Sequence, residues 1–222
     1  MCLTIPVKPR TLPTSQTMRR TKEDAQLTRE KLLDTAELVF GNKGVARTSL
    51  QDIAQAAGLT RGAIYWHFQD KAALFSAMMD RIVTPMEEAL KALTEHPGKD
   101  PMADLREAML VSLRLITDDE RTRRVMQIAV RQAPFVGEMA GALERRLEVH
   151  LRCRGHIESA VRSAQALGLA QQALAPRAVA TSIMAIIAGL IDLWVLEPSL
   201  FPLVEAGQQA LDVYLAGLKS VA

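Results

Sequence analysis

The stretch of the sequence that decides the fold is SLQDIAQAAGLTRGAIYWHF, residues 49–68. Its apolar residues at positions 50, 53, 54 and 57 have the spacing of one helix face, and Gly58 follows where a left-handed C-terminal cap belongs. Thr60 can then cap a second helix, on which Leu59 and Ile64 face inward together with Phe68. A helix, a tight glycine turn and a second helix predict a helix-turn-helix.

The outward face of the second helix carries side chains that suit DNA. Arg61 can donate two hydrogen bonds to O6 and N7 of a guanine, Gly62 permits close approach of the backbone, and the Ala63 methyl can contact a thymine methyl. Base reading is therefore expected at the start of this helix. Donors suited to phosphates, which fix register without reading sequence, are expected at Thr48, Ser49, Tyr65, His67 and Lys71, and Trp66 shares the outward face.

A purely structural role for these aromatic residues is the alternative. Tyr65, Trp66, His67 and Phe68 could pack the core of a small three-helix domain. Four consecutive rings, at about 100° per residue, fan over most of the helix circumference, so they cannot all point inward. Some of them must meet solvent or a ligand, which favours the DNA-binding interpretation.

Three ordered motifs within residues 21–75 resemble a known family: TREKLLDTAELVF, GVARTSLQDIAQAAGLTRGAIYWHF and DKAALF. They are similar to the TetR family of transcriptional repressors, and in particular to the AcrR/TtgR-like group that controls multidrug efflux pumps. The resemblance implies an N-terminal three-helix DNA-binding domain, a larger all-helical domain that binds an inducer, and a homodimer. Carried over by position, the DNA-facing set implied by the resemblance is Thr48, Thr60, Arg61, Gly62, Ala63, Tyr65, Trp66, His67 and Lys71.

Charge and cysteine content agree with a DNA-binding protein of the cytoplasm. Residues 1–71 hold eleven Lys and Arg against seven Asp and Glu, a balance of +4, whereas the remainder holds sixteen against eighteen, a balance of −2. The basic end coincides with the expected DNA reader. Cys2 and Cys153 lie far apart in the sequence, which argues against a disulfide scaffold and favours a reducing compartment.

The expected domain organisation has three parts. Residues 1–20 are expected to be a flexible arm without a secretory signal, residues 21–70 the DNA-binding domain, and residues 71–222 a ligand-binding and dimerisation domain. The basic residues Arg19, Arg20 and Lys22 can follow the phosphate backbone or enter the minor groove, and a solvated end is the alternative.

Helical periodicity continues along the chain, and no segment alternates with a period of two. We therefore expect an all-α protein of about nine helices. Beyond the two helices of the DNA reader, helices are expected at residues 23–42, 71–93, 102–117, 118–133, 137–167, 176–196 and 202–219. The helix from residue 71 joins the two domains and contains Pro85, which is expected to kink it. A motion in the larger domain is expected to reach the recognition helix through residues 72–86.

The helix expected at residues 176–196 is apolar at all nine positions from Ile183 to Ile191. A membrane span is the alternative, but Asp192 would be costly in a bilayer and no basic cluster flanks the segment. Burial against the protein's own domain on one side and a second subunit on the other explains it better. Together with the last helix and the same two helices of a second subunit, it would form a four-helix bundle across a twofold axis. The two DNA-binding domains of the dimer would then bind the two halves of a palindromic operator. The dimer candidates are Leu190, Leu193, Trp194, Leu211, Tyr214, Leu215 and Leu218.

Eight methionines beyond residue 75 suggest an adaptable apolar cavity between the helices of the larger domain. Any single methionine can instead fill an ordinary gap in the core. The expected cavity-lining residues are Met86, Leu93, Met109, Leu113, Met126, Val130, Phe135, Met184, Ile187 and Ile191.

Catalysis and metal binding have little support in the sequence. There is no nucleophile elbow, no phosphate-binding glycine loop and no HExxH motif, and no cofactor is expected. His150, Cys153 and His156 share a helix but would leave a metal shell incomplete. We expect a dimeric repressor that a hydrophobic compound releases from DNA. The resemblance to the TetR family implies that its target is an efflux operon and that its inducers are drugs or aromatic compounds. The alternatives are a DNA-binding regulator controlled by a partner protein and an enzyme that carries a DNA-binding domain.

Overall fold

A computed structural model describes residues 15–96, 98–133 and 136–219. These residues form nine α-helices and one short 3₁₀ helix, and they contain a single isolated β-bridge between Ala170 and Lys219. The all-α prediction is thereby confirmed. The elements are α1 (Ser15–Lys43), α2 (Leu50–Ala56), α3 (Arg61–His67), α4 (Lys71–Glu95), α5 (Pro101–Asp118), α6 (Glu120–Arg131), η1 (Gly137–Met139), α7 (Ala140–Ala166), α8 (Pro176–Leu196) and α9 (Leu203–Ala216).

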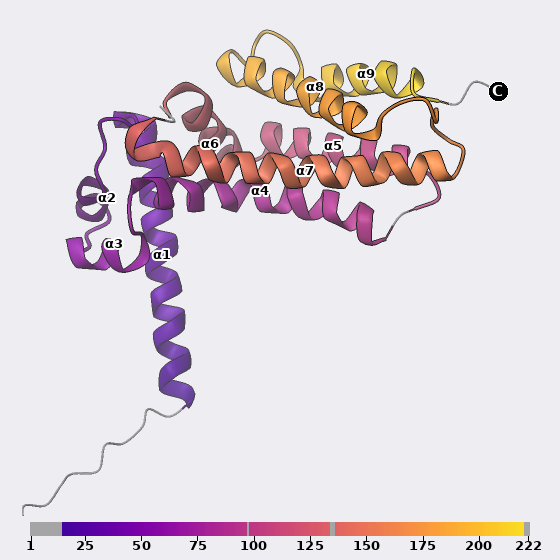
Figure 1. Ribbon diagram of the computed structural model, residues 1–222. Helices are drawn as coiled ribbons and strands as arrows, with labels where there is room; N and C mark the ends of the chain where they lie inside the picture. Colours follow the sequence, from indigo (N-terminus) through magenta and orange to yellow (C-terminus); the bar gives the residue numbers. More distant parts are fainter. Residues whose placement is uncertain (1–14, 97, 134–135, 220–222) are drawn as a thin grey trace, which may run out of the picture.

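The molecule has a small helical headpiece at one end of an elongated helical bundle (Figure 1). Helices α1, α2 and α3 form the headpiece, and the lower half of α1 projects from it. The bundle contains α4, α5 and α7, and α8 and α9 lie side by side along one edge of it (Figure 1). This arrangement separates α3 from the pair α8 and α9, so one molecule presents two distinct surfaces.

Local sequence signals explain the helix-turn-helix. Ser49 and Asp52 form a capping box at the start of α2: the Asp52 N–H donates to Ser49 Oγ at 3.2 Å, and the Ser49 N–H donates to Asp52 Oδ2 at 2.8 Å. Gly58 has a φ of +66°, the left-handed conformation that the turn requires. Thr60 caps α3 by accepting the Ala63 N–H at 3.2 Å, as predicted.

Two hydrophobic cores hold the molecule together. The first packs the headpiece onto the start of α4 and onto α6, and its largest fully buried side chains include Phe40 and Ile53. The second packs α5, α7, α8 and α9 with the end of α4. Helix α6 contacts the headpiece directly, because its buried side chains Val125, Ile128 and Ala129 belong to the first core. Helix α6 thus provides a second physical connection between the larger domain and the headpiece, beside the connection through α4 that the sequence predicts.

Several helix boundaries differ from the predicted ones. Helix α1 begins at Ser15 rather than at residue 23, since no proline follows Pro13 until α4, so residues 15–20 of the expected arm are helical. Residues 1–14 of that arm lie outside the described residues. Helix α6 begins at Glu120 because the Asp119 carboxylate caps it by accepting the Thr122 N–H at 2.8 Å. Helix α4 stays helical through Pro85.

Helix α8 matches its predicted bounds and is long and apolar enough to cross a membrane by length and composition alone. In this structure its inner side chains, such as Ile183 and Val195, are fully buried in the second core. Its outer face remains uncovered at Ala185, Gly189 and Leu193, so burial on all sides is not achieved within one chain.

Candidate DNA-binding face and ligand cavity

The outward face of α3 is exposed, as the DNA-binding interpretation requires. The Trp66 side chain is 72% exposed and that of Tyr65 is 47% exposed, whereas Ile64 and Phe68 are buried. The interpretation that all four aromatic rings pack the core is therefore wrong for Tyr65 and Trp66. Arg61, Gly62 and Thr60 are exposed on the same helix start, and Ala63 is half-buried.

Contacts within the face orient its side chains. The Arg61 guanidinium lies over the Tyr65 ring at 5.4 Å from the centroid, and Trp66 meets His67 edge to face at 4.5 Å between centroids. Burial, and then the nearby Arg29 guanidinium, lower the pKa of His67 below its ordinary value, which favours the neutral imidazole. The ring can then still donate one N–H.

Lys71 does not face the DNA, contrary to the prediction. Its side chain is 5% exposed, and Nζ donates to the carbonyls of Val45 at 2.9 Å and Thr48 at 3.0 Å. Nζ also forms an ion pair with Glu138 of η1 at 2.6 Å. The first turn of α4 packs beneath the 44–49 loop, so the ammonium satisfies the carbonyls of that loop rather than a phosphate.

Thr48 is also turned inward, whereas Ser49 stays on the surface. The Thr48 side chain is 2% exposed, and its hydroxyl donates to the Gly44 carbonyl at 2.8 Å, so it cannot reach a phosphate. Ser49 is exposed, but its hydroxyl is engaged with Asp52 in the capping box. Its O–H and its backbone N–H are both donated to Asp52 Oδ2, so in this arrangement Ser49 has no donor free for a phosphate, contrary to the prediction.

A cavity of about 210 Å³ lies between α4, α5, α6, α7 and α8. The predicted lining residues that border it are Met86, Met109, Met126, Val130, Met184, Ile187 and Ile191. Leu113 does not border it, because its fully buried side chain packs against Gly207 of α9. Leu93 packs on the second core instead, and Phe135 lies outside the described residues.

Helix α7 supplies a wall of the cavity that the sequence reasoning missed. Arg146, Val149, His150, Cys153 and Ile157 line it at intervals of three and four residues. This spacing on one helix face was the available signal, although charged residues interrupt it. The cavity is therefore largely apolar with a few polar groups from α4, α7 and α8.

The polar groups at the cavity have different partners. Arg145 of α7 is paired with Asp80 of α4, with 3.3 Å between Nε and Oδ1. On α8, Asp192 has no hydrogen bond or ion pair with any residue of the described part. Burial raises the pKa of the Cys153 thiol to about 11, so the thiol stays protonated near neutral pH.

The three helical residues considered for a metal do not converge. His150 Nδ1 contacts the Arg146 carbonyl at 3.0 Å, and His156 Nδ1 contacts the Thr94 hydroxyl at 3.2 Å. Within residues 22–219, apart from the undescribed positions 97 and 134–135, no group of three or more His, Cys, Asp or Glu side chains could hold a metal ion.

The predicted dimer residues divide into buried and uncovered ones. Trp194, Leu211 and Leu218 are at most 7% exposed and pack into the second core of their own chain, so they are not available to a partner. Leu193 is 53% exposed. Leu190, Tyr214 and Leu215 are half-buried. Exposed apolar side chains that were not predicted stand at Leu196, Val213, Leu143, Leu147 and Leu151.

Comparisons with known proteins identify the family. A sequence profile of bacterial regulatory proteins of the tetR family matches residues 32–78, and the C-terminal region of MAATS-type transcriptional repressors matches residues 100–220. The chain belongs to the TetR family. The first match contains the whole of α2 and α3, and the second contains four of the five helices that bound the cavity, α5 to α8, apart from α4.

Curated relatives in this family are similar over most of the chain. The regulator TtgR of Pseudomonas putida is 36% identical over 181 residues, which are 82% of this chain and 86% of TtgR. The regulator AcrR of Shigella flexneri is 35% identical over 198 residues, 89% of this chain and 92% of AcrR.

Solved structures of TetR-family repressors superpose well. NalD, the secondary repressor of the MexAB-OprM multidrug efflux pump in Pseudomonas aeruginosa, gives a TM-score of 0.81 at 32% identity over 88% of this chain and 98% of NalD. The SmeT–triclosan complex gives 0.80 at 32% identity over 87% of this chain and 92% of SmeT, a protein of Stenotrophomonas maltophilia. The protein is thus a helix-turn-helix transcriptional repressor and not an enzyme.

Proposed function

We propose that this TetR-family protein represses a multidrug efflux operon in the cytoplasm and leaves its operator when a hydrophobic or aromatic compound binds. Residues 21–70 would bind a palindromic operator, and residues 71–222 would bind the compound and a second copy of the chain. The relatives support the efflux target, since NalD and SmeT are both described as repressors of multidrug efflux pumps.

The observation that carries the proposal is the uncovered aromatic face of α3. An indole that is 72% exposed beside a well-packed core calls for a partner, and Arg61 lies at the start of the same helix. A major groove accepts one α-helix, so this face can place Arg61 on base edges while Tyr65 and His67 donate to phosphates. Thr48 and Lys71 take no part in this contact.

The cavity supports the ligand-responsive part of the proposal. Its methionines, Met86, Met109, Met126 and Met184 among them, can adapt to apolar ligands of different shapes. The related SmeT has been solved with triclosan, a lipophilic aromatic compound. A ligand of this kind releases DNA only if it binds the DNA-incompetent arrangement more tightly than the DNA-competent one.

The uncovered faces of α8 and α9 support a homodimer. Leu193, Leu196 and Val213 are each more than half exposed, and Ala185 and Gly189 on α8 would allow close approach of a second helix pair. We expect Val213→Glu to convert the dimer to a monomer in sedimentation velocity. Leu27→Glu, an equally exposed position on the headpiece, serves as the control and should leave the dimer intact. A monomeric unmodified protein would contradict this part of the proposal.

The operator and the ligand can be tested with the same preparation. Fragmented host DNA is passed over the immobilised protein, retained fragments are sequenced, and binding of the enriched site is followed by fluorescence anisotropy with and without triclosan. We expect a palindrome upstream of an efflux-pump operon and weaker binding in triclosan. Enrichment of unrelated sites would contradict the efflux target. If triclosan and a panel of lipophilic compounds neither stabilise the protein thermally nor weaken binding, control by a partner protein would be favoured.

A further inference from the structure

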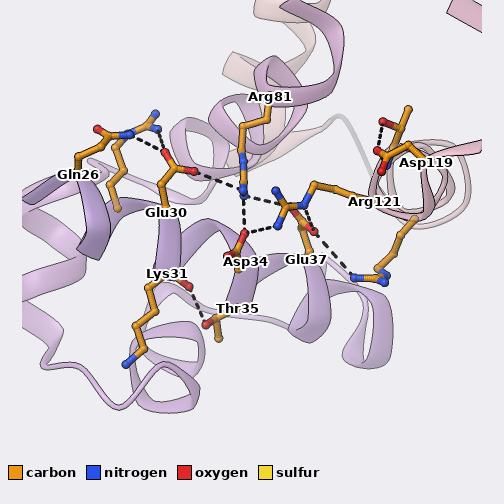
Figure 2. Close-up of polar contacts among 12 residues, drawn as sticks. Gln26, Glu30, Lys31, Asp34, Thr35, Glu37, Arg81, Asp119 and Arg121 are labelled. Carbon is orange, nitrogen blue, oxygen red and sulfur yellow. Dashed lines mark hydrogen bonds and ion pairs between the residues drawn. The ribbon is translucent and has the colours of Figure 1, made fainter. Parts of the chain in front are cut away.

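A cluster of six charged side chains joins the headpiece to the two helices that run from it along the cavity (Figure 2). Three carboxylates of α1 stand at intervals of four and three residues and so share one helix face, and three arginines approach them from α4 and α6. We call this group the ion cluster. Its members are Glu30, Asp34 and Glu37 of α1, Arg81 of α4, and Arg121 and Arg124 of α6.

Two carboxylates of the ion cluster are shared between α4 and α6. Asp34 Oδ1 accepts from Arg81 and from Arg121, each at 2.8 Å. Glu37 Oε1 accepts from Arg81 at 3.1 Å, and Glu37 Oε2 lies 3.5 Å from Arg121 Nε and 4.0 Å from Arg124 Nη1. Figure 2 shows Asp34 and Glu37 between the arginines of the two other helices. A shift of α4 relative to α6 would therefore break contacts at both carboxylates.

Burial makes these contacts hard to give up. Glu37 is 2% exposed, and burial raises the pKa of its carboxyl above the ordinary value even though arginines surround it. A carboxylate in this position is strongly destabilised if its cationic partners withdraw, because water cannot replace them. Loss of these contacts is therefore costly, which favours a headpiece that moves with the arginines over one that releases them.

The same two helices border the cavity with their other faces. Helix α6 contributes Met126, Ala129 and Val130, and α4 contributes Met79 and Val83 close to Arg81. The C-terminal end of α6 is tied to α1 as well, because the Gln132 side chain donates to the Gly41 carbonyl at 3.3 Å. A compound that spreads α4 and α6 must act directly on the ion cluster.

We propose that the ion cluster is the element that couples cavity occupancy to the headpiece, with Glu37 as its buried hub and Arg121 as the contact that lets α6 act on α1. This inference rests on the proposed function. The cluster is a set of positioning residues: none of its members borders the cavity or lies on the outward face of α3. Its loss should leave both binding reactions in place and weaken only their coupling.

The test compares three variants with the unmodified protein. Arg121→Gln removes the α6 contact from a half-exposed position, and Glu37→Gln removes the hub. Glu95→Gln is the matched control, since Glu95 pairs at 3.4 Å with Lys91 on α4 and neither residue belongs to the ion cluster. Operator Kd is measured by fluorescence anisotropy with and without saturating triclosan, and triclosan Kd by calorimetry. The coupling ratio is operator Kd with triclosan divided by operator Kd without it.

We expect Arg121→Gln and Glu37→Gln to lower the coupling ratio by about 3- to 10-fold, while Glu95→Gln leaves it unchanged. The operator Kd without triclosan and the triclosan Kd without operator should each stay within about threefold of the unmodified protein. General destabilisation would not produce this pattern. An unchanged ratio in folded Arg121→Gln would overturn the inference. If Glu37→Gln does not fold, Arg121→Gln decides.

A second arm needs no ligand. Val130→Phe adds a ring to the cavity from α6 and imitates an occupant, so it should weaken operator binding in the unmodified background and much less in the Arg121→Gln background. If neither triclosan nor Val130→Phe affects operator binding of the unmodified protein, the proposed function fails. If both weaken it equally with and without Arg121→Gln, only the ion cluster inference fails.

Discussion

Replacing Lys71 with methionine separates a structural lysine from a DNA-binding one. Methionine keeps most of the length and apolar stem of the side chain, but it removes the ammonium that donates to the Val45 and Thr48 carbonyls at 2.9 and 3.0 Å. The Val45 carbonyl keeps the Thr48 N–H at 3.3 Å, whereas the Thr48 carbonyl loses the Nζ donor. A hydrogen bond from a charged donor contributes about 1.5 to 3 kcal/mol, so the variant should lose about 3 kcal/mol of unfolding free energy.

The ion pair of Lys71 with Glu138 adds little to this figure. The Glu138 side chain is 66% exposed, and a pair with such a partner is strongly screened by water. Lys31→Met is the matched control, because Lys31 is an exposed lysine of the same headpiece. It should change the unfolding free energy by less than about 0.5 kcal/mol. Both variants are measured by urea unfolding at one fixed protein concentration, since dimerisation makes apparent stability depend on concentration.

Operator binding provides the second measurement for Lys71→Met. A lysine that neutralises a phosphate contributes about one unit per site to the slope of log K against log salt concentration. The buried Lys71 should contribute nothing, so the slope should stay unchanged under conditions in which the variant is folded. Unaltered stability together with a slope reduced by about one unit would refute the structural role and restore the phosphate contact.

Three further predictions concern the headpiece. Arg61→Ala should weaken operator binding by about 1 to 3 kcal/mol and relax the preference at one base pair, measured by competition with operators substituted one pair at a time; a uniform loss over all operators would assign Arg61 to phosphates. Trp66→Ala should weaken operator binding but change the unfolding free energy by less than about 0.5 kcal/mol, and a large loss of stability would mean that the indole is packed. The Ser49 N–H, and then the Lys43 side chain, lower the pKa of Asp52 from 3.8 to about 2, so its stabilising effect is present above about pH 4 and lost as the pH falls through 2. Asp52→Asn should flatten this acid limb in urea unfolding followed from about pH 5 to about pH 2, and an unchanged limb would show that other carboxylates cause it.

The helix-turn-helix could be predicted from the sequence because its determinants are local. Gly58 adopts the left-handed turn conformation itself, and Thr60 caps a backbone N–H only three residues away. The apolar spacing of α2 requires only that one face of the helix be buried. Lys71 could not be placed in this way. Its burial depends on where the 44–49 loop and η1 come to lie, and these segments are far apart in the sequence.

The same limit applies to predicting which residues line the cavity and which face a second subunit. Met126 and Met184 were placed at the cavity by residue type, but the contribution of α7 depends on how that helix is rotated in the bundle. Trp194 and Leu211 were assigned to the partner because α8 and α9 are apolar on more than one side. Periodicity gives the angle between two residues on a helix, and it does not say which side meets the protein's own core.

The contacts of α6 with the rest of the molecule determine what a bound compound could move. At the N-terminal end of α6, Arg121 contacts α1, and at its C-terminal end Gln132 contacts Gly41, which also belongs to α1. Arg131 of α6 donates to the Val195 carbonyl at the end of α8 at 2.7 Å. Helix α6 therefore touches the headpiece, the cavity and the helix on which we place the dimer contact. We expect a helix of twelve residues that is held at three such points to move as one body. The distance between the two headpieces of a dimer would then depend on its position, and that distance decides whether two recognition helices fit successive major grooves.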